Sequence, residues 1–184
     1  MRVAAAVLLL MLAGCAAAPL RLAPAEAVAK VDLDRYMGTW YVIGRTPSYN
    51  ERRQVAVTVD YARGQDGSIF IVQHSRDQDF THAPEQLSGR GSVVDPVSNA
   101  LWSVKFPWSG AQDYAVVYLD DSYQHAIAVD APHQRVWLLA REARVSDDTY
   151  EVYLAVLRAK NFDTDKVVRV PQIEDQLGAP GYTP

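Results

Sequence analysis

The chain has a single cysteine, Cys15, among its 184 residues, and this excludes an intrachain disulfide. It also lacks a basic excess, because 18 Lys and Arg stand against 22 Asp and Glu, giving a formal net charge of -4. Such a balance offers no electrostatic footprint for nucleic acid. The sequence motifs of serine hydrolases, zinc proteases and phosphate-binding loops are missing. We therefore expect a protein that is not an enzyme, with no cofactor and no nucleic-acid partner.

The N-terminal apolar stretch is too short to cross a bilayer. Residues 3–13 follow Arg2 and form a run of about eleven apolar residues, the length of a signal-peptide core. The run ends in Leu12-Ala13-Gly14-Cys15, which resembles the lipobox of bacterial lipoproteins. An ordinary secretory signal with an incidental cysteine is the alternative.

The lipobox resemblance implies a division of the first thirty residues. Residues 1–14 would be a signal peptide that is removed before Cys15, and acyl chains would then anchor Cys15 in a membrane. Residues 15–30 are rich in Ala and Pro and would form a tether between the lipid and the domain. Ala16, in place of an aspartate, implies sorting to the outer membrane of a Gram-negative cell.

Short strands with alternating apolar residues fill most of the remaining chain. The expected strands are residues 39–46, 53–61, 68–75, 85–94, 100–106, 113–119, 124–129 and 135–141. Turn signals such as Gly64-Gln65-Asp66-Gly67 and Asp95-Pro96 separate them. Eight strands in sequence favour an all-β, antiparallel up-and-down barrel, because closure removes the exposed strand edges.

The hydrophobic period changes after the eighth strand. Tyr150, Tyr153, Leu154 and Leu157 share one face of a helix, and Ser146 provides a capping residue before it. We expect one C-terminal α-helix packed on the barrel wall. The barrel domain would span residues 31–172, and residues 173–184 would form a C-terminal tail.

Two motifs at opposite ends of this strand-rich region carry a family resemblance. Gly38-Thr39-Trp40-Tyr41 opens the first strand, and a stretch ending in Arg141 closes the last one. The pair resembles the lipocalin family, and the blocks around it are most similar to the bacterial outer-membrane lipoprotein lipocalins. The resemblance implies that Trp40 plugs the closed end of the barrel and that Arg141 lies across its ring. Gly38, Trp40 and Arg141 would thus determine the fold and would not contact ligand.

The function that this resemblance implies is ligand binding, and strand alternation suggests which side chains point inward. The expected lining residues are Trp102, Val104, Phe106, Tyr114, Val116, Tyr118, Trp137 and Leu139, and Gly44 would leave room inside. The expected ligand is a fatty acid or lysophospholipid taken from the membrane. Two alternatives stay open: a structural or interaction lipoprotein with a packed barrel, and a scavenger of other hydrophobic compounds. The oligomeric state is also open, a homodimer included.

One cluster has residue types that could bind a metal ion. His74, Asp77, Asp79 and His82 lie across a connection between two expected strands. We interpret them as solvated loop residues and expect no metal.

Overall fold

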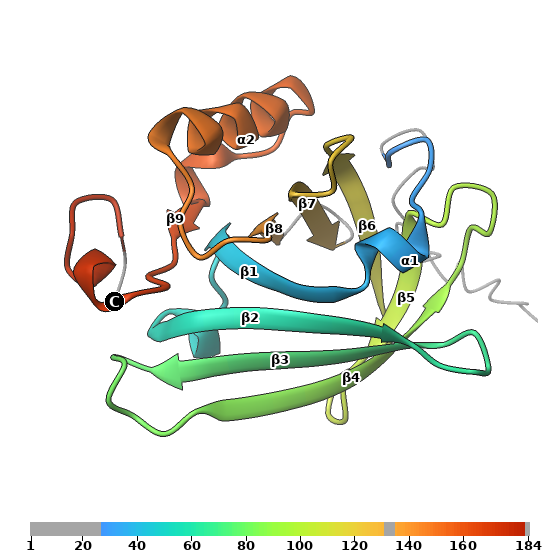
Figure 1. The fold of residues 1–184 in the computed structure, drawn as a ribbon, viewed down its shortest axis with the longest axis horizontal. Helices are drawn as coiled ribbons and strands as arrows, with labels where there is room; N and C mark the ends of the chain where they lie inside the picture. The colour runs from blue at the N-terminus through green and yellow to red at the C-terminus, as the bar shows by residue number, and fades with distance from the viewer. Residues whose placement is uncertain (1–26, 131–134, 183–184) are drawn as a thin grey trace, which may run out of the picture.

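The structure, a computed structural model, describes residues 27–130 and 135–182, which form a sheet that closes on itself (Figure 1). Helix α1 (Leu33–Tyr36) precedes the barrel. The strands are β1 (Gly38–Arg45), β2 (Gln54–Arg63), β3 (Ile69–Asp77), β4 (Glu85–Val93), β5 (Leu101–Lys105), β6 (Gln112–Leu119), β7 (His125–Asp130) and β8 (Val136–Ala140). Each is antiparallel to the next, and β1 pairs with both β2 and β8, which closes the barrel.

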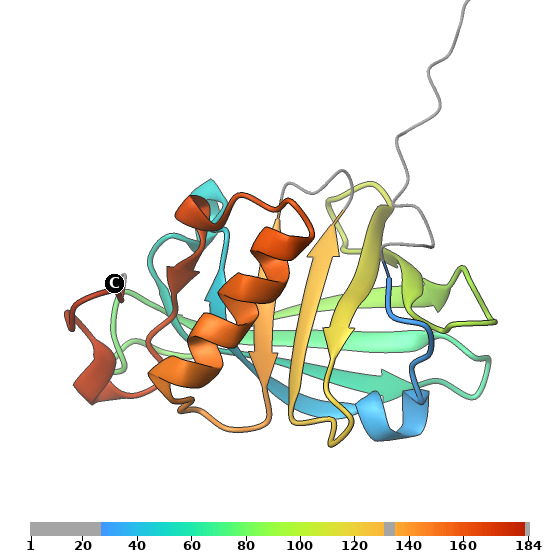
Figure 2. The same cartoon turned by 90° about the horizontal axis from the view of Figure 1, so that it is seen from above.

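The eight-stranded antiparallel barrel expected from the sequence is therefore confirmed. Its strand bounds differ from the expected ones by no more than two residues. The strands of β2–β4 run across those of β6–β8 (Figure 2), so the barrel has two crossing walls around one interior.

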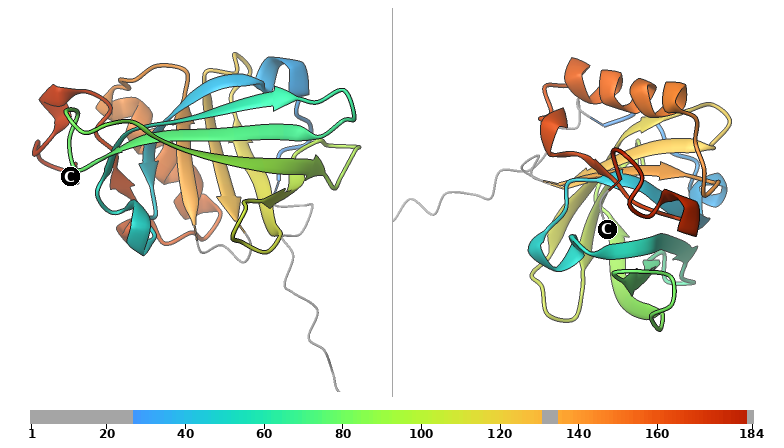
Figure 3. Two further views of the ribbon diagram at one scale, coloured as in Figure 1. Left: turned by 90° about the horizontal axis from the view of Figure 1, so that it is seen from below. Right: turned by 90° about the vertical axis from the view of Figure 1, so that its left-hand side faces the viewer.

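Helix α2 (Asp147–Ala159) confirms the expected C-terminal helix. It begins where the Ser146 hydroxyl accepts a hydrogen bond from the Thr149 amide at 3.1 Å. Its buried face carries Tyr150, Tyr153 and Leu157, which pack on the outward side chains of the barrel wall. The helix lies outside the ring of strands in the right-hand view of Figure 3. The wall beneath α2 is thus buried on both of its faces.

The barrel seam between β1 and β2 needs a third segment. The ladder between β1 and β2 ends at the pair Tyr41 and Thr58, and β9 (Val168–Arg169) pairs with the end of β1 beyond it. Just beyond β9, the Gln172 Nε2 donates to the carbonyl oxygens of Val42 at 2.7 Å and Val57 at 3.1 Å. The C-terminal segment therefore bridges the two strands where their own ladder ends.

A register shift in the β1–β8 ladder, between Val42 and Gly44, corrects one expectation. Gly44 does not leave room inside the barrel, because it faces outward. A Cβ built on it would lie 3.0 Å from Leu138 Cδ1 and 3.2 Å from the Tyr150 ring. Gly44 instead allows α2 to approach the wall closely.

Three short 3-10 helices lie in the connections, at Tyr49–Glu51 (η2), Thr164–Lys166 (η3) and Glu174–Gln176 (η4). No helix within residues 27–130 and 135–182 has the length and apolar character needed to cross a membrane. Cys15, the expected signal peptide and most of the expected tether lie outside the described residues.

Candidate functional site

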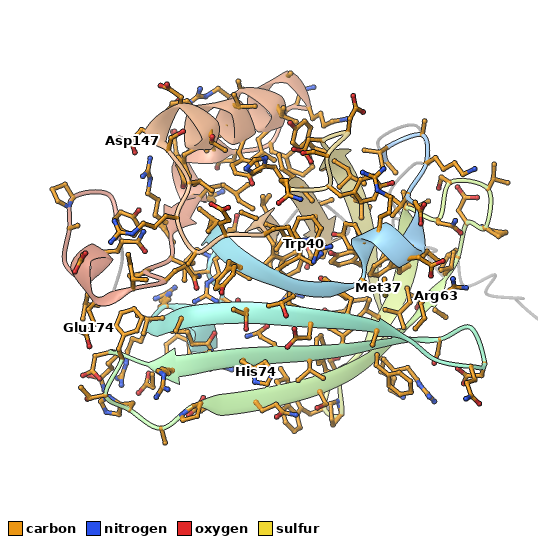
Figure 4. The ribbon with its side chains drawn as sticks, viewed as in Figure 1. Met37, Trp40, Arg63, His74, Asp147 and Glu174 are labelled. Carbon is orange, nitrogen blue, oxygen red and sulfur yellow. The ribbon has the colours of Figure 1, made fainter. Side chains whose placement is uncertain are left out.

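Helix α1 and the start of β1 close one end of the barrel. Trp40 is completely buried, and its indole Nε1 donates to the Tyr36 carbonyl at 2.8 Å. Met37 joins α1 to β1, as Figure 4 shows beside the labelled Trp40. The Arg141 side chain, from just after β8, donates to the carbonyl oxygens of Thr39 and Met37 at 2.7 and 2.9 Å. Burial lowers the pKa of this guanidinium. The Trp40 side chain therefore blocks this end of the barrel.

Aromatic rings fill the barrel above this plug. Trp102 stacks on Tyr114 with ring centres 4.9 Å apart, and its edge meets Tyr36 at 5.6 Å. Tyr61 lies 5.5 Å from Trp102 and 6.2 Å from Tyr114. These rings are at most 9% exposed. The closed half of the barrel is therefore solid, and any ligand must occupy the other half.

Three tyrosine hydroxyls meet inside this aromatic cluster. The Tyr114 hydroxyl shares one hydrogen bond with that of Tyr61 at 2.8 Å and another with that of Tyr36 at 3.1 Å. Burial raises the pKa of all three phenols, so each stays neutral at physiological pH and keeps its proton. We call Tyr36, Tyr61 and Tyr114 the tyrosine triad.

A cavity of about 250 Å³ occupies the open half of the barrel. Its apolar lining comes from both walls: Val42, Val59, Tyr61, Ile71, Leu87, Val104, Phe106, Tyr114, Trp137 and Leu139. Tyr61 and Tyr114 form its floor, because the remaining triad member, Tyr36, is completely buried beneath them. The Phe106 ring packs directly over Gly89, where a Cβ would lie 2.7 Å from it.

Polar side chains surround the mouth of the cavity. Arg135 forms an ion pair with Asp130 at 2.7 Å, and its guanidinium carbon lies 5.2 Å from the centre of the Trp137 ring. The cavity lining also includes Gln54, whose Oε1 accepts from Arg45 Nη1 at 3.2 Å. Trp108, in the β5–β6 connection, is 80% exposed beside the opening. The apolar interior thus opens through an amphipathic rim.

Arg45 is a buried cation near this rim. It is 2% exposed and donates to the carbonyl oxygens of Glu51 and Gln54, while its Nε has no hydrogen-bond partner among the described residues. Burial lowers its pKa, and the nearby Glu51 opposes this effect. The contacts fix the β1–β2 connection, which carries η2, against the mouth.

The structure brings five of the eight expected lining residues together. Val104, Phe106, Tyr114, Trp137 and Leu139 all line the cavity. Trp102 and Val116 face the interior but belong to the packed core outside the cavity lining. The expectation that these two would touch the cavity is therefore corrected, because strand alternation gives the face of a residue but not its depth along the barrel.

Tyr118 is the one expected lining residue on the wrong face. The β6–β7 register shifts between Val116 and Tyr118, so the alternation slips by one residue there. The Tyr118 ring packs outside the barrel, 6.4 Å from Tyr153 of α2 and perpendicular to it. Burial raises the pKa of Tyr118, and Asp120 and Asp121 raise it further.

Sequence reasoning missed the lining residues of the opposite wall. Val59, Tyr61, Ile71 and Leu87 come from β2, β3 and β4. The alternation of β2 was visible in the sequence, and Val57, Val59 and Tyr61 share its inward face, whereas a bulge separates Val55 from them. This signal identifies the second wall of the site.

The four expected loop residues do not converge on one point. His82 contacts Asp79 at 2.8 Å, His74 contacts Asp60 at 3.2 Å, and Asp77 forms an ion pair with Arg53. Within the described ranges, no group of three or more His, Cys, Asp or Glu side chains could hold a metal ion.

Comparisons with known proteins agree with this geometry. A family model described as a lipocalin-like domain matches residues 31–172. The chain is 31% identical over 147 residues to the outer membrane lipoprotein Blc of Escherichia coli (strain K12), covering 79% of this chain and 81% of the relative. It is 29% identical to temperature-induced lipocalin-1 of Arabidopsis thaliana, covering 80% and 82% of the two chains.

Solved structures support the same fold. Insecticyanin from the tobacco hornworm Manduca sexta superposes with a TM-score of 0.65 at 18% identity, covering 87% of this chain and 90% of the other. Lobster apocrustacyanin A1 superposes with a TM-score of 0.62 at 16% identity, covering 78% and 81%. Taken with the matching family model and the Blc relatives, the barrel, its plugged end and its apolar cavity show that this chain belongs to the lipocalin family.

Proposed function

We propose that this protein is a membrane-anchored lipid-binding protein of the bacterial envelope, which stores or transports fatty acids or lysophospholipids. The observation that carries this proposal is the cavity of about 250 Å³, with apolar walls and a polar rim. An acyl chain needs apolar area with few polar atoms, and its head group needs water or polar partners. The apolar side chains lie inside the cavity and the polar side chains lie at its mouth, so the cavity suits both parts of such a ligand.

The size of the cavity favours a ligand with one acyl chain. Pockets for small ligands range over roughly 300–1,000 Å³, so this cavity is small. Aromatic rings already occupy the closed half of the barrel, which limits the depth that a chain can reach. A fatty acid or a lysophospholipid is therefore a better candidate than a phospholipid with two chains.

Transfer of such a ligand between a membrane and the barrel costs little. Burying a chain of about sixteen carbons contributes on the order of 12 kcal/mol relative to water, at about 0.8 kcal/mol per CH₂. A bilayer offers nearly the same gain. The net free energy of transfer is then small, and a barrel close to a membrane can both load and release its ligand.

Two exposed aromatic side chains support a position next to a membrane. Tyr49 in η2 is 83% exposed and Trp108 is 80% exposed, and both lie in connections at the open end. Tyr and Trp are favoured at membrane interfaces, where a ring can contact acyl chains while its polar atom meets water. The Arg52 guanidinium lies 5.7 Å from the Tyr49 ring and adds a positive charge there.

The anchor would be Cys15, acylated in the outer membrane. This part of the proposal rests on the lipobox resemblance and on the relatives named outer membrane lipoprotein Blc. Mass spectrometry of the mature protein tests it: the N-terminus should be residue 15 with added acyl mass, and Cys15→Ala should abolish both. An N-terminus elsewhere without acyl mass would contradict the anchor.

Ligand binding is tested with residues 16–184, which contain every described element and no acyl anchor. Titration with saturated fatty acids of increasing length should change tryptophan emission, because Trp137 lines the cavity. Affinity should rise with chain length until the floor is reached. Absence of binding, or affinity independent of chain length, would favour the packed structural lipoprotein instead.

A further inference from the structure

The tyrosine triad at the cavity floor contains one more donor than its own hydrogen bonds can use. Its three hydroxyls carry three protons, one on each oxygen. Tyr114 shares one hydrogen bond with Tyr61 and one with Tyr36, and these two bonds consume two of the protons. Whichever oxygen donates in each bond, one O–H remains. No acceptor for it is present among the described residues.

This remaining proton belongs to a buried group. Tyr36 is 0% exposed, Tyr61 5% and Tyr114 9%. An O–H without a partner in such surroundings is unfavourable, so the proton will reside on the oxygen that can find an acceptor. Burial raises the pKa of each phenol, so loss of the proton does not resolve the mismatch.

Only two members of the triad can offer the proton to a ligand. Tyr61 and Tyr114 line the cavity, whereas Tyr36 lies beneath them. If Tyr36 donates to Tyr114 and Tyr114 donates to Tyr61, the remaining O–H is on Tyr61, which lines the cavity. The Trp102 ring packs against both Tyr61 and Tyr114 and provides no strong acceptor.

We propose that the cavity prefers ligands whose buried end carries a hydrogen-bond acceptor oxygen, which receives the O–H at its floor. This inference rests on the proposed lipid-binding function and specifies the ligand more closely. Two kinds of amphiphile present this chemistry. One is an acyl chain with an oxygen at its far end, such as an ω-hydroxy fatty acid. The other is a carboxylic acid that enters with its head group first.

The test compares dodecanoic acid with 12-hydroxydodecanoic acid, using residues 16–184 and a fluorescence titration. An added hydroxyl weakens binding in a purely apolar pocket, because its desolvation is not compensated. At this floor, the hydroxylated ligand should bind at least as tightly as the plain one. In the double variant Tyr61→Phe/Tyr114→Phe, the affinity for 12-hydroxydodecanoic acid relative to that for dodecanoic acid should fall by on the order of tenfold.

Tyr36→Phe is the matched control. It removes one triad hydroxyl but keeps those of Tyr61 and Tyr114. The hydrogen bond between them uses one of their two protons, so one O–H still remains at the floor. The affinity ratio should therefore stay close to that of the unmodified protein. Circular dichroism verifies that each variant is folded before its ratio is used.

A second measurement distinguishes the two sources of the oxygen. The carboxyl carbon of ¹³C-labelled dodecanoic acid is titrated by NMR in the complex. A carboxyl group at the floor would have a raised pKa because of burial, whereas one at the mouth would titrate near its ordinary value. The first result identifies head-first entry. The second places the carboxyl at the mouth, so that a preference for the hydroxylated ligand then comes from the oxygen at the far end of its chain.

The outcomes separate this inference from the proposed function. If both ligands bind, their affinity ratio is the same in the unmodified protein and the double variant, and the bound carboxyl titrates near its ordinary value, the inference is overturned and lipid binding stands. A water molecule would then hold the O–H. If neither ligand binds, both the inference and the proposed function are overturned.

Discussion

The guanidinium carbon of Arg141 lies 3.8 Å from the centre of the Trp40 ring, although the two residues are at opposite ends of the barrel sequence. The same guanidinium donates through Nη2 to the carbonyl oxygens of Arg35, Tyr36 and Met37 at 2.9, 3.1 and 2.9 Å. One side chain therefore holds α1, the first strand and the last strand together. These contacts stabilise the closed end at a distance from the cavity.

Arg141→Ala should lower the free energy of unfolding by roughly 1–3 kcal/mol, because it removes the cation–π contact and leaves several carbonyl oxygens without a donor. Denaturant unfolding measures this change. Arg158→Ala is the control, since Arg158 is exposed on α2 and its contact with Glu151 spans 3.7 Å. Ligand affinity per folded molecule should stay unchanged, and a shift in ligand preference at unaltered stability would contradict this role.

Leu87 and Ser88 are neighbours on β4 with opposite orientations. Leu87 lines the cavity, and Ser88 is exposed on the outer face. Leu87→Glu places a carboxylate against the acyl chain and should weaken fatty-acid binding by at least tenfold, whereas Ser88→Glu should leave it unchanged. A fluorescence titration of both variants measures the effect. Equal affinities for the two variants would show that the acyl chain does not occupy this cavity.

Trp108 and Val97 are exposed at opposite ends of the barrel, at 80% and 83%. If the open end contacts the membrane, Trp108→Ser should reduce binding of residues 16–184 to phospholipid vesicles severalfold, because the interface loses an aromatic ring. Val97→Ser should have no such effect. Vesicle co-sedimentation of the two variants provides the comparison, and an equal loss in both would contradict a membrane contact at the mouth.

Stability should decrease in alkaline solution. Burial raises the pKa of Tyr150 to about 12 and raises that of Tyr153 further, whereas tyrosines in the unfolded chain ionise near pH 10. The folded state favours the neutral phenol, so this stability is fully present below about pH 10. It is lost as the pH rises through the folded pKa, by on the order of 1.4 kcal/mol per pH unit for each such group.

Chemical denaturation at several pH values between 9 and 11 measures this loss. Tyr153→Phe should reduce the slope of stability against pH, since the hydroxyl that donates to the Leu139 carbonyl at 2.6 Å is gone. An unchanged slope in this variant would mean that Tyr153 ionises equally in both states.

The periodic features of this protein were predictable from its sequence because they are local. Alternation placed Val104, Phe106, Trp137 and Leu139 on inward faces, and all four line the cavity. Ser146 and the apolar spacing after it predicted the capped helix. The outward Val117 also follows alternation, but its burial beneath α2 depends on a segment some thirty residues later in the chain.

Tertiary structure alone decided the features that depend on register and depth. The register shift after Val116 turns Tyr118 outward, and the amino-acid types of these two residues do not reveal this shift. Trp102 and Val104 share a face, yet only Val104 reaches the cavity, because depth depends on how strands tilt and pair around the barrel.

The tyrosine triad shows the same division most clearly. The sequence by itself determined that Tyr114 lies on an inward face, through the local alternation of its strand. Only the closed barrel brings it to Tyr36 and Tyr61, which lie 78 and 53 residues away in the sequence. Local periodicity fixes which side of a strand is apolar, but contacts between distant strands fix which polar atoms meet at the floor of the site.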